Sequence, residues 1–250
     1  MTVRGSGADQ KGGMSSALGL VAIGTTPRPD YLEVFGAQCP GTPLALRGAL
    51  DGRTDAEIAA LGIERQRGSV EYPLLCRLAH NGTTIEIDLG VLFPFIADAA
   101  RALAADGCAA VVVCCCGNFP RVEDCPVPVL FPGRVMPAVA ASVCAAAAPR
   151  VAVVSPIAGQ MAEAEKHWRE EGFAPTMGFG DWTGEDRAEL EATAARIGAE
   201  DVELVVLDCM GHDDAFRAFF AERCGGKPVL LAQTVVAKVA SELLPPPPRL

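Results

Sequence analysis

The strongest constraint on the fold of this chain is a regular alternation of short apolar runs with longer helical patterns. Val- and Leu-rich runs of strand length occupy residues 18–24, 108–115, 150–156 and 202–211, and helical patterns fill much of the sequence between them. Parallel strands covered by helices on both faces have such continuous apolar runs. The alternation therefore predicts an α/β fold built on parallel sheets.

Weaker patterns complete this alternation. Further strands are expected at 43–52, 127–133, 174–180 and 227–233, and helices at 55–62, 91–107, 134–149, 158–172, 183–200, 213–226 and 234–244. Thr183 is the expected N-cap of its helix, with Asp186 at N3, and Pro149 is expected to stop the Ala-rich helix. Within 63–89, Asn81-Gly82 predicts a β-hairpin, because this dipeptide fits tight turns between antiparallel strands.

The two halves of the chain echo each other. CAAVVVCCCGN (108–118) and VELVVLDCMGH (202–212) are both an apolar strand followed by cysteine and then glycine. The repetition predicts two pseudo-symmetric Rossmann-like lobes whose matching strand ends face each other. We expect the first lobe at 18–132 together with 227–250, the second lobe at 133–226, and a disordered tail at 1–17.

Composition narrows the possible partners. The formal net charge of −10 argues against nucleic acid or an anionic membrane surface as the main partner. No segment approaches the ~20 apolar residues of a membrane span. The Gly- and Ser-rich start is not a signal peptide. The ten cysteines fall mostly in Ala- and Val-rich elements, which favours free thiols and a cytoplasmic location.

Polar residues follow the first strand in the stretch IGTTPRPD (23–30). Ligands in open α/β sheets bind at the carboxyl ends of strands. The hydroxyls of Thr25 and Thr26 could hold a carboxylate together with Arg28, whose guanidinium can bind one bidentately. The other interpretation is an ordinary loop in which the threonines cap the next element.

Three adjacent cysteines end the strand at 108–115. Alternation along a strand sends Cys114 and Cys116 to one face and Cys115 to the other. A thiol near a helix N-terminus can ionise and act as base or nucleophile. Gly117 allows close approach of a ligand, and Asn118 can donate to it. The alternative is that all three cysteines pack in the core.

The stretch LDCMGHDD (207–214) ends the matching strand in the second half. His212 could pair with the Cys209 thiol or face solvent at a helix start, and Asp208 could orient a neighbour or act as a cap. Cys209 and His212 form only half of a zinc motif, and no dinucleotide or Walker motif occurs. We therefore expect no metal and no cofactor.

Four stretches together resemble the AroM family: VAIGTTPRPD, the Cys-x-Gly-x-Phe-Pro loop, VVLDCMG and LLAQTVVAKVASELL. The resemblance covers residues 18–244, with the motifs in the expected order. AroM proteins are similar to the aspartate/glutamate/hydantoin racemase superfamily, which includes maleate isomerases and arylmalonate decarboxylases. The resemblance implies two similar lobes with the site in the cleft between them.

The resemblance also implies roles for individual residues. Cys115 and Cys209, one from each lobe, would be the acid/base pair of a cofactor-independent racemase. The substrate-contacting set would be Thr25, Thr26, Arg28, Cys116, Gly117, Asn118, Gly211 and His212. Two departures matter. Cys116 stands where the superfamily has a threonine hydroxyl, and His212 follows its cysteine one place later than usual.

The expected function is racemisation, epimerisation or isomerisation through a proton α to a carboxylate or carbonyl of a small substrate. This mechanism needs thiol pKa values lowered by helix N-termini and loop N–H groups. One alternative is a one-thiol lyase or decarboxylase, and another is a non-catalytic small-molecule binding or regulatory protein. A weaker one is a structural homo-oligomer, formed through helices bearing Val139 and Val143. Arg28 and Arg134 are the candidate partners for a second carboxylate.

Overall fold

A computed structural model describes residues 17–65, 70, 72–181 and 186–244. The expected tail at 1–17 lies outside them, except for Ala17, which begins the first strand. One four-stranded parallel sheet has the order β2-β1-β5-β6. Its strands are β1 (Ala17–Ala22), β2 (Leu44–Gly48), β5 (Cys108–Val113) and β6 (Val129–Leu130). This sheet is the core of the first lobe.

The second lobe contains a sheet with the same order. Its four parallel strands run β8-β7-β9-β10, so that β7 corresponds to β1 and β9 to β5. They are β7 (Arg150–Ser155), β8 (Ala174–Phe179), β9 (Leu204–Leu207) and β10 (Val229–Leu231). The sequence placed the last strand in the first lobe. This was wrong for β10, because it pairs with β9.

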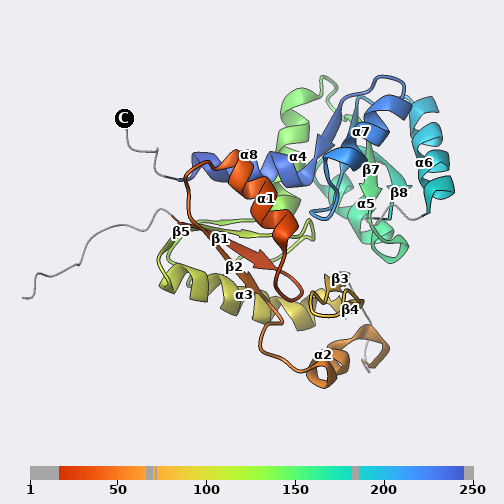
Figure 1. Ribbon diagram of the computed structural model, residues 1–250. Coiled ribbons are helices and arrows are strands. Elements are labelled where there is room, and N and C mark those ends of the chain that lie inside the picture. The colour runs from red at the N-terminus through yellow and green to blue at the C-terminus, as the bar shows by residue number, and fades with distance from the viewer. Residues whose placement is uncertain (1–16, 66–69, 71, 182–185, 245–250) are drawn as a thin grey trace, which may run out of the picture.

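Helices connect the strands and cover both faces of each sheet (Figure 1). In the first half they are α1 (Pro29–Gln38), α2 (Asp55–Leu61), α3 (Leu89–Ala105) and α4 (Pro132–Val143). In the second half they are α5 (Met161–Glu170), α6 (Arg187–Ala199), α7 (Asp214–Arg223) and α8 (Ala232–Glu242). Short 3-10 turns lie at Ile63–Arg65 and Ala158–Gln160.

Three helix details differ from the expectation. The sequence missed α1, although Tyr31 and Phe35 are both buried at the four-residue spacing of a helix face. Helix α4 ends at Val143, well before Pro149, and the backbone N–H of Ala145 instead donates to the Glu203 carboxylate at 2.8 Å. The N-cap of α6 is Asp186 rather than Thr183, which lies outside the described residues.

The last helix of each half contacts the opposite lobe. Helix α8 lies beside α1 (Figure 1), where the Cys39 thiol lies 3.8 Å from the Ala237 carbonyl. In the same way, His167 Nε2 on α5 donates to the Gly133 carbonyl of α4 at 2.8 Å. The two lobes therefore exchange their terminal helices. A single apolar core joins the inner faces of both sheets.

The predicted hairpin is present, and the described residues of the second lobe form no counterpart to it. Strands β3 (Pro73–Arg77) and β4 (Thr84–Asp88) pair antiparallel. The hairpin contacts the first lobe where the backbone N–H of Thr25 donates to the Arg77 carbonyl at 3.0 Å. Gly24 is required at this junction, because a Cβ there would collide with that carbonyl. The hairpin thus covers the carboxyl end of β1.

Candidate active site

The carboxyl ends of β5 and β9 meet at one cavity between the lobes. Cys114 to Gly117 follow β5, Asp208 to Gly211 follow β9, and all these residues line the cavity. Its volume is about 750 Å³, measured out to its open mouth. The prediction that matching strand ends lie together is confirmed, because both sets of residues share this one space.

The two predicted thiols occupy equivalent backbone settings. The Cys209 thiol accepts the backbone N–H of Gly211 at 3.2 Å and a further hydrogen bond from the N–H of His212. The Cys115 thiol accepts the backbone N–H groups of Gly117 and Cys116. Each sulfur therefore receives an N–H group from the glycine two residues later. Such donors stabilise a thiolate more than a thiol.

Burial outweighs these donors. It raises the pKa of Cys115 to about 12 and that of Cys209 to about 11, although the N–H groups lower both values. The expectation of lowered thiol pKa values is therefore wrong. The cause is desolvation, which disfavours a thiolate that has little contact with water. Both sulfurs are thiols near neutral pH.

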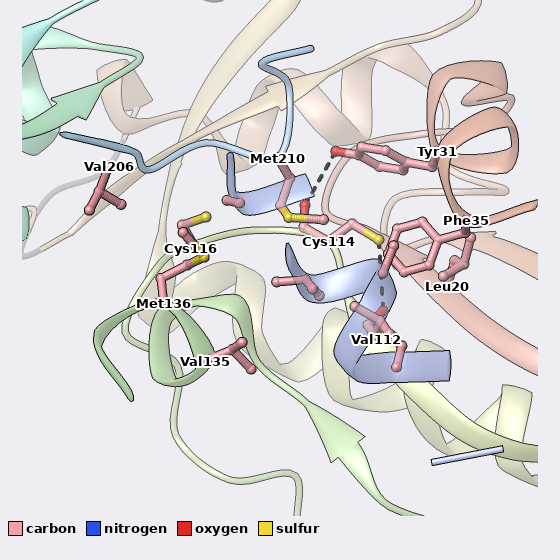
Figure 2. Packing of buried hydrophobic residues seen from close by; sticks show 14 of the residues in the cluster. Leu20, Tyr31, Phe35, Val112, Cys114, Cys116, Val135, Met136, Val206 and Met210 are labelled. Atoms are coloured by element: carbon pink, nitrogen blue, oxygen red, sulfur yellow. Dashed lines mark hydrogen bonds between the residues drawn. The ribbon is translucent and has the colours of Figure 1, made fainter. Parts of the chain in front are cut away.

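The other two cysteines of the triplet differ from Cys115. Cys114 is 2% exposed and packs with Phe35 and Leu20 in the interlobe core, while the Tyr31 hydroxyl donates to its carbonyl at 3.3 Å (Figure 2). The Cys116 thiol donates a hydrogen bond to Asp208. Cys115 belongs to the opposite side of the sheet, as strand alternation predicted. Cys115 is also the least buried of the three.

Arg28 is the buried cation at this cavity. Its side chain is 8% exposed, stacks on the Tyr31 ring at 3.8 Å from the centroid, and makes two hydrogen bonds to the Asp30 carboxylate. Its positive charge lowers the pKa of Cys209. Arg28 therefore lines the cavity with its guanidinium paired to Asp30, and its binding of a substrate carboxylate stays a prediction. Arg134 instead donates to the Phe119 carbonyl at 2.9 Å and does not line the cavity.

Four predicted site residues do not line the cavity. The Thr25 hydroxyl accepts the N–H of Ala79, and Thr26 makes two hydrogen bonds to Asp51, so both hold loops together. The side chain of Asn118 is exposed. His212 is buried and stacks on Phe216 at 4.0 Å, with Nε2 donating to the Gly180 carbonyl. The alternative that the threonines cap the next element is also wrong, because the N-cap of α1 is Arg28 and no side chain caps that helix.

The sequence missed the residues that the hairpin and the second lobe add to the cavity. They are Tyr72, Leu75, Arg77, Thr84, Ser155, Pro156, Gln160 and Ala164. Their positions gave no signal, because a hairpin far along the chain from both cysteines has no motif that points to the cavity. The placement of Asp208 was left open between an orienting residue and a cap. In the structure it faces the cavity and accepts the Trp168 indole N–H at 3.0 Å.

Among residues 17–65, 70, 72–181 and 186–244, no cluster of three or more His, Cys, Asp or Glu side chains could hold a metal ion. Within the same ranges, no helix is long and apolar enough to cross a membrane.

Comparisons with solved structures show the fold. Glutamate racemase isoform RacE1 from Bacillus anthracis superposes with a TM-score of 0.60 at 14% identity, over 92% of this chain and 82% of that one. Arylmalonate decarboxylase gives 0.57 at 17% identity, covering 91% and 92% of the two chains. Allantoin racemase from Pseudomonas fluorescens gives 0.57 at 18%, covering 91% and 90%. The α/β two-lobe fold is therefore confirmed.

Comparison with sequences gives the family. A search of curated proteins returned no match. The family model described as AroM protein matches residues 18–244. This range includes both Cys-x-Gly strand ends and the exchanged helices, and it is the range over which the motifs showed the resemblance. The chain belongs to the AroM family.

Proposed function

We propose that this protein is a cofactor-independent racemase, epimerase or isomerase that moves a proton on the carbon α to a carboxylate or carbonyl. One observation carries the proposal. Cys115 and Cys209 come from opposite lobes, line one cavity, and each accepts the N–H of the glycine two residues later. General acid–base catalysis at a chiral carbon needs two such groups, one for each face.

The proposed reaction moves one proton on and one proton off the substrate. One cysteine, as thiolate, takes the α-proton, so that the C–H bond breaks and an S–H bond forms. The electron pair left on carbon delocalises into the carboxylate or carbonyl as an enolate. The other cysteine, as thiol, then gives its proton to the opposite face of that carbon. Arg28 binds the substrate carboxylate and stabilises the negative charge that develops on it.

The test is α-proton exchange in D₂O. The protein is incubated with amino acids, hydantoins, hydroxy acids and dicarboxylic acids, and deuterium uptake is followed by NMR. Cys115→Ala and Cys209→Ala should each slow exchange of the one accepted substrate class by at least about a hundredfold, the usual contribution of such a group. Cys125→Ala is the matched control, because Cys125 is a partly exposed cysteine outside the cavity.

The pattern of loss separates the remaining possibilities. Inversion and exchange at the wild-type rate in either cavity variant would refute the two-thiol mechanism. Dependence on one cysteine alone, with release of CO₂, would identify a one-thiol decarboxylase.

The raised thiol pKa values favour a second candidate, a protein that binds small carboxylates without turnover. A thiol with a pKa near 11 or 12 provides little thiolate at neutral pH. In that case, isothermal titration calorimetry would detect a ligand from the same panel that shows no deuterium uptake. An Arg28→Met variant would lose that binding. Cys115→Ala would keep it.

A further inference from the structure

Asp208 is the acidic residue of the interlobe cavity. It follows β9 directly and lines the same space as Cys115 and Cys209. It is the only carboxylate among the described residues that line the cavity. A carboxylate taken out of water needs hydrogen-bond donors to compensate for its lost hydration. Its surroundings therefore show what holds it there.

Two donors from different lobes fix the Asp208 carboxylate. The Trp168 indole, fully buried on α5, donates to Oδ2 at 3.0 Å. The Cys116 thiol from the first lobe donates to the same carboxylate. These bonds hold the acid between the two strand ends. Burial raises the pKa of Asp208, and the hydrogen bonds from Trp168 and Cys116 partly offset this effect. Because neither donor carries a formal positive charge, the carboxylate leaves its negative charge on the rest of the cavity.

The groups that face this charge come from five segments. Three of them are thiols, namely Cys115 and Cys116 after β5 and Cys209 after β9. Tyr72 lies before β3 and His167 on α5. Arg28, before α1, acts on the same Cys209 thiol. After burial, the charge of Asp208 is among the causes that raise the pKa of all three thiols and of Tyr72. The same charge would attract a cation or an N–H donor that entered the cavity.

We propose that the ligand of this cavity places an ammonium or other N–H donor on the Asp208 carboxylate, and that this pairing favours ionisation of the adjacent Cys209 thiol, which burial otherwise keeps protonated. In that step the S–H bond of Cys209 breaks, the electron pair stays on sulfur, and the proton leaves to water at the cavity mouth. The preferred ligand carries a donor for Asp208 and a carboxylate for Arg28. The inference rests on the proposed function, because an ionised thiol serves the proposed proton transfer. Its test measures alkylation of a cysteine and does not require turnover of a substrate.

The first experiment uses the wild-type protein and three alkylating reagents of different charge. Iodoacetamide is neutral, 2-bromoethylammonium is cationic, and iodoacetate is anionic. Rates at Cys209 are measured by peptide mass spectrometry at pH 8 and divided by the rates for N-acetylcysteine amide. The cationic reagent should be favoured about tenfold over the neutral one, the effect of about one pKa unit. Equal normalised rates, or a preference for iodoacetate, would overturn the proposal.

The second experiment removes the charge of Asp208 and keeps its shape. Asp208→Asn should raise the iodoacetamide rate at Cys209 about tenfold at pH 8 and abolish the preference for the cationic reagent. Asp213→Asn is the matched control, because Asp213 is an exposed N-cap outside the cavity and asparagine caps a helix equally well. An alkylation profile of Asp208→Asn that coincides with the wild type would refute the role of the carboxylate.

The outcomes separate this inference from the proposed function. A preference for the cationic reagent without α-proton exchange would support the proposed role of Asp208 and refute the racemase proposal. If α-proton exchange needs both cysteines but alkylation shows no charge preference, the racemase proposal is supported and the proposed role of Asp208 is refuted.

Discussion

The ends of β5 and β9 share one arrangement of backbone N–H groups around a thiol, but they differ in the side chains beside it. In both, the thiol accepts the N–H of the glycine two residues later, at Gly117 and Gly211. The residue before the thiol is the core cysteine Cys114 in one lobe and the cavity acid Asp208 in the other. The duplicated fold therefore supplies the positions of a thiol pair, and the neighbouring side chains make its two members unequal.

The exchanged helices repeat this contrast. Helix α4 presents Gly133 to the carbonyls of Cys116 and Gly117, where no side chain fits. Helix α8 presents Gln233, whose side-chain amide donates to the Met210 carbonyl at 3.1 Å. One lobe is thus held by close backbone contact and the other by a side-chain hydrogen bond.

The largest expected effect concerns the residue three places after each thiol. His212 is buried with Nδ1 unpartnered, whereas its counterpart Asn118 is exposed and cannot titrate. Burial lowers the pKa of His212 to about 4. An unfolded histidine takes up its proton near pH 6.5. The unfolded state therefore binds more protons between pH 6.5 and 4, and the free energy of unfolding falls as the pH falls through this range.

This loss amounts to about 3 kcal/mol at pH 4, since one pKa unit corresponds to about 1.4 kcal/mol. Urea denaturation at a series of pH values should show it in the wild type. His212→Gln should be less stable at neutral pH but should lose less of its stability on acidification. If the free energy of unfolding of the two proteins changes equally with pH, His212 is not the cause of the loss of stability in acid. The difference between His212 and Asn118 would then have no effect on stability.

Gly133→Ala should damage the first lobe's strand end. The new Cβ would lie 2.6 Å from the carbonyl oxygens of Cys116 and Gly117, so the backbone must move. Overpacking of this kind destabilises a protein by about 1–3 kcal/mol. Chemical denaturation measures the loss. Gly36→Ala in α1 is the matched control, because its Cβ would meet only Leu44 at 3.9 Å, and that variant should be at least as stable as the wild type.

Gln233→Met should affect the second lobe's strand end less. Methionine has a similar size but cannot donate, so the buried Met210 carbonyl loses its hydrogen bond from Gln233. The expected loss is about 1–2 kcal/mol in the free energy of unfolding, the usual penalty for an unsatisfied buried group. A loss larger than that of Gly133→Ala would reverse the ranking of the two contacts.

The smallest effect is expected for Asn118→Ala. This side chain is exposed and does not line the cavity, in contrast to the role that the resemblance implied for it. Stability should change by less than about 0.5 kcal/mol, as for most surface substitutions. Deuterium exchange of the accepted substrate should stay within about twofold of the wild type. A tenfold fall would place Asn118 on the substrate after all.

The strands, the hairpin and the facing of two strand ends could be predicted because they follow from local patterns. Val111 and Val112 alternate between two cores, as a strand covered on both faces requires. Helix α1 was missed because its short sequence follows a Thr-Pro-Arg-Pro run typical of loops. The sheet that β10 joins depends on how the lobes pack, and the three residues of β10 contain no pattern that distinguishes one sheet from the other.

The site was predictable only in part. The sequence placed Cys115, Cys209 and Arg28 at the carboxyl ends of strands, and all three line the cavity. The protonation of the two thiols could not be predicted, because burial dominates their pKa values and depends on how distant parts of the chain pack together. Thr25 was misassigned because its hydroxyl can bind a ligand or a backbone N–H equally well, and Ala79 provides the N–H.

The exchange of α4 and α8 has a consequence for how this molecule could be divided. A cut in the link between Val143 and Arg150 would leave two fragments with the same sheet order. Each fragment would end in a helix whose docking surface belongs to the other, at α5 for α4 and at α1 for α8. The halves are therefore complementary rather than autonomous, and reassembly of the fragments would restore the cavity together with the fold.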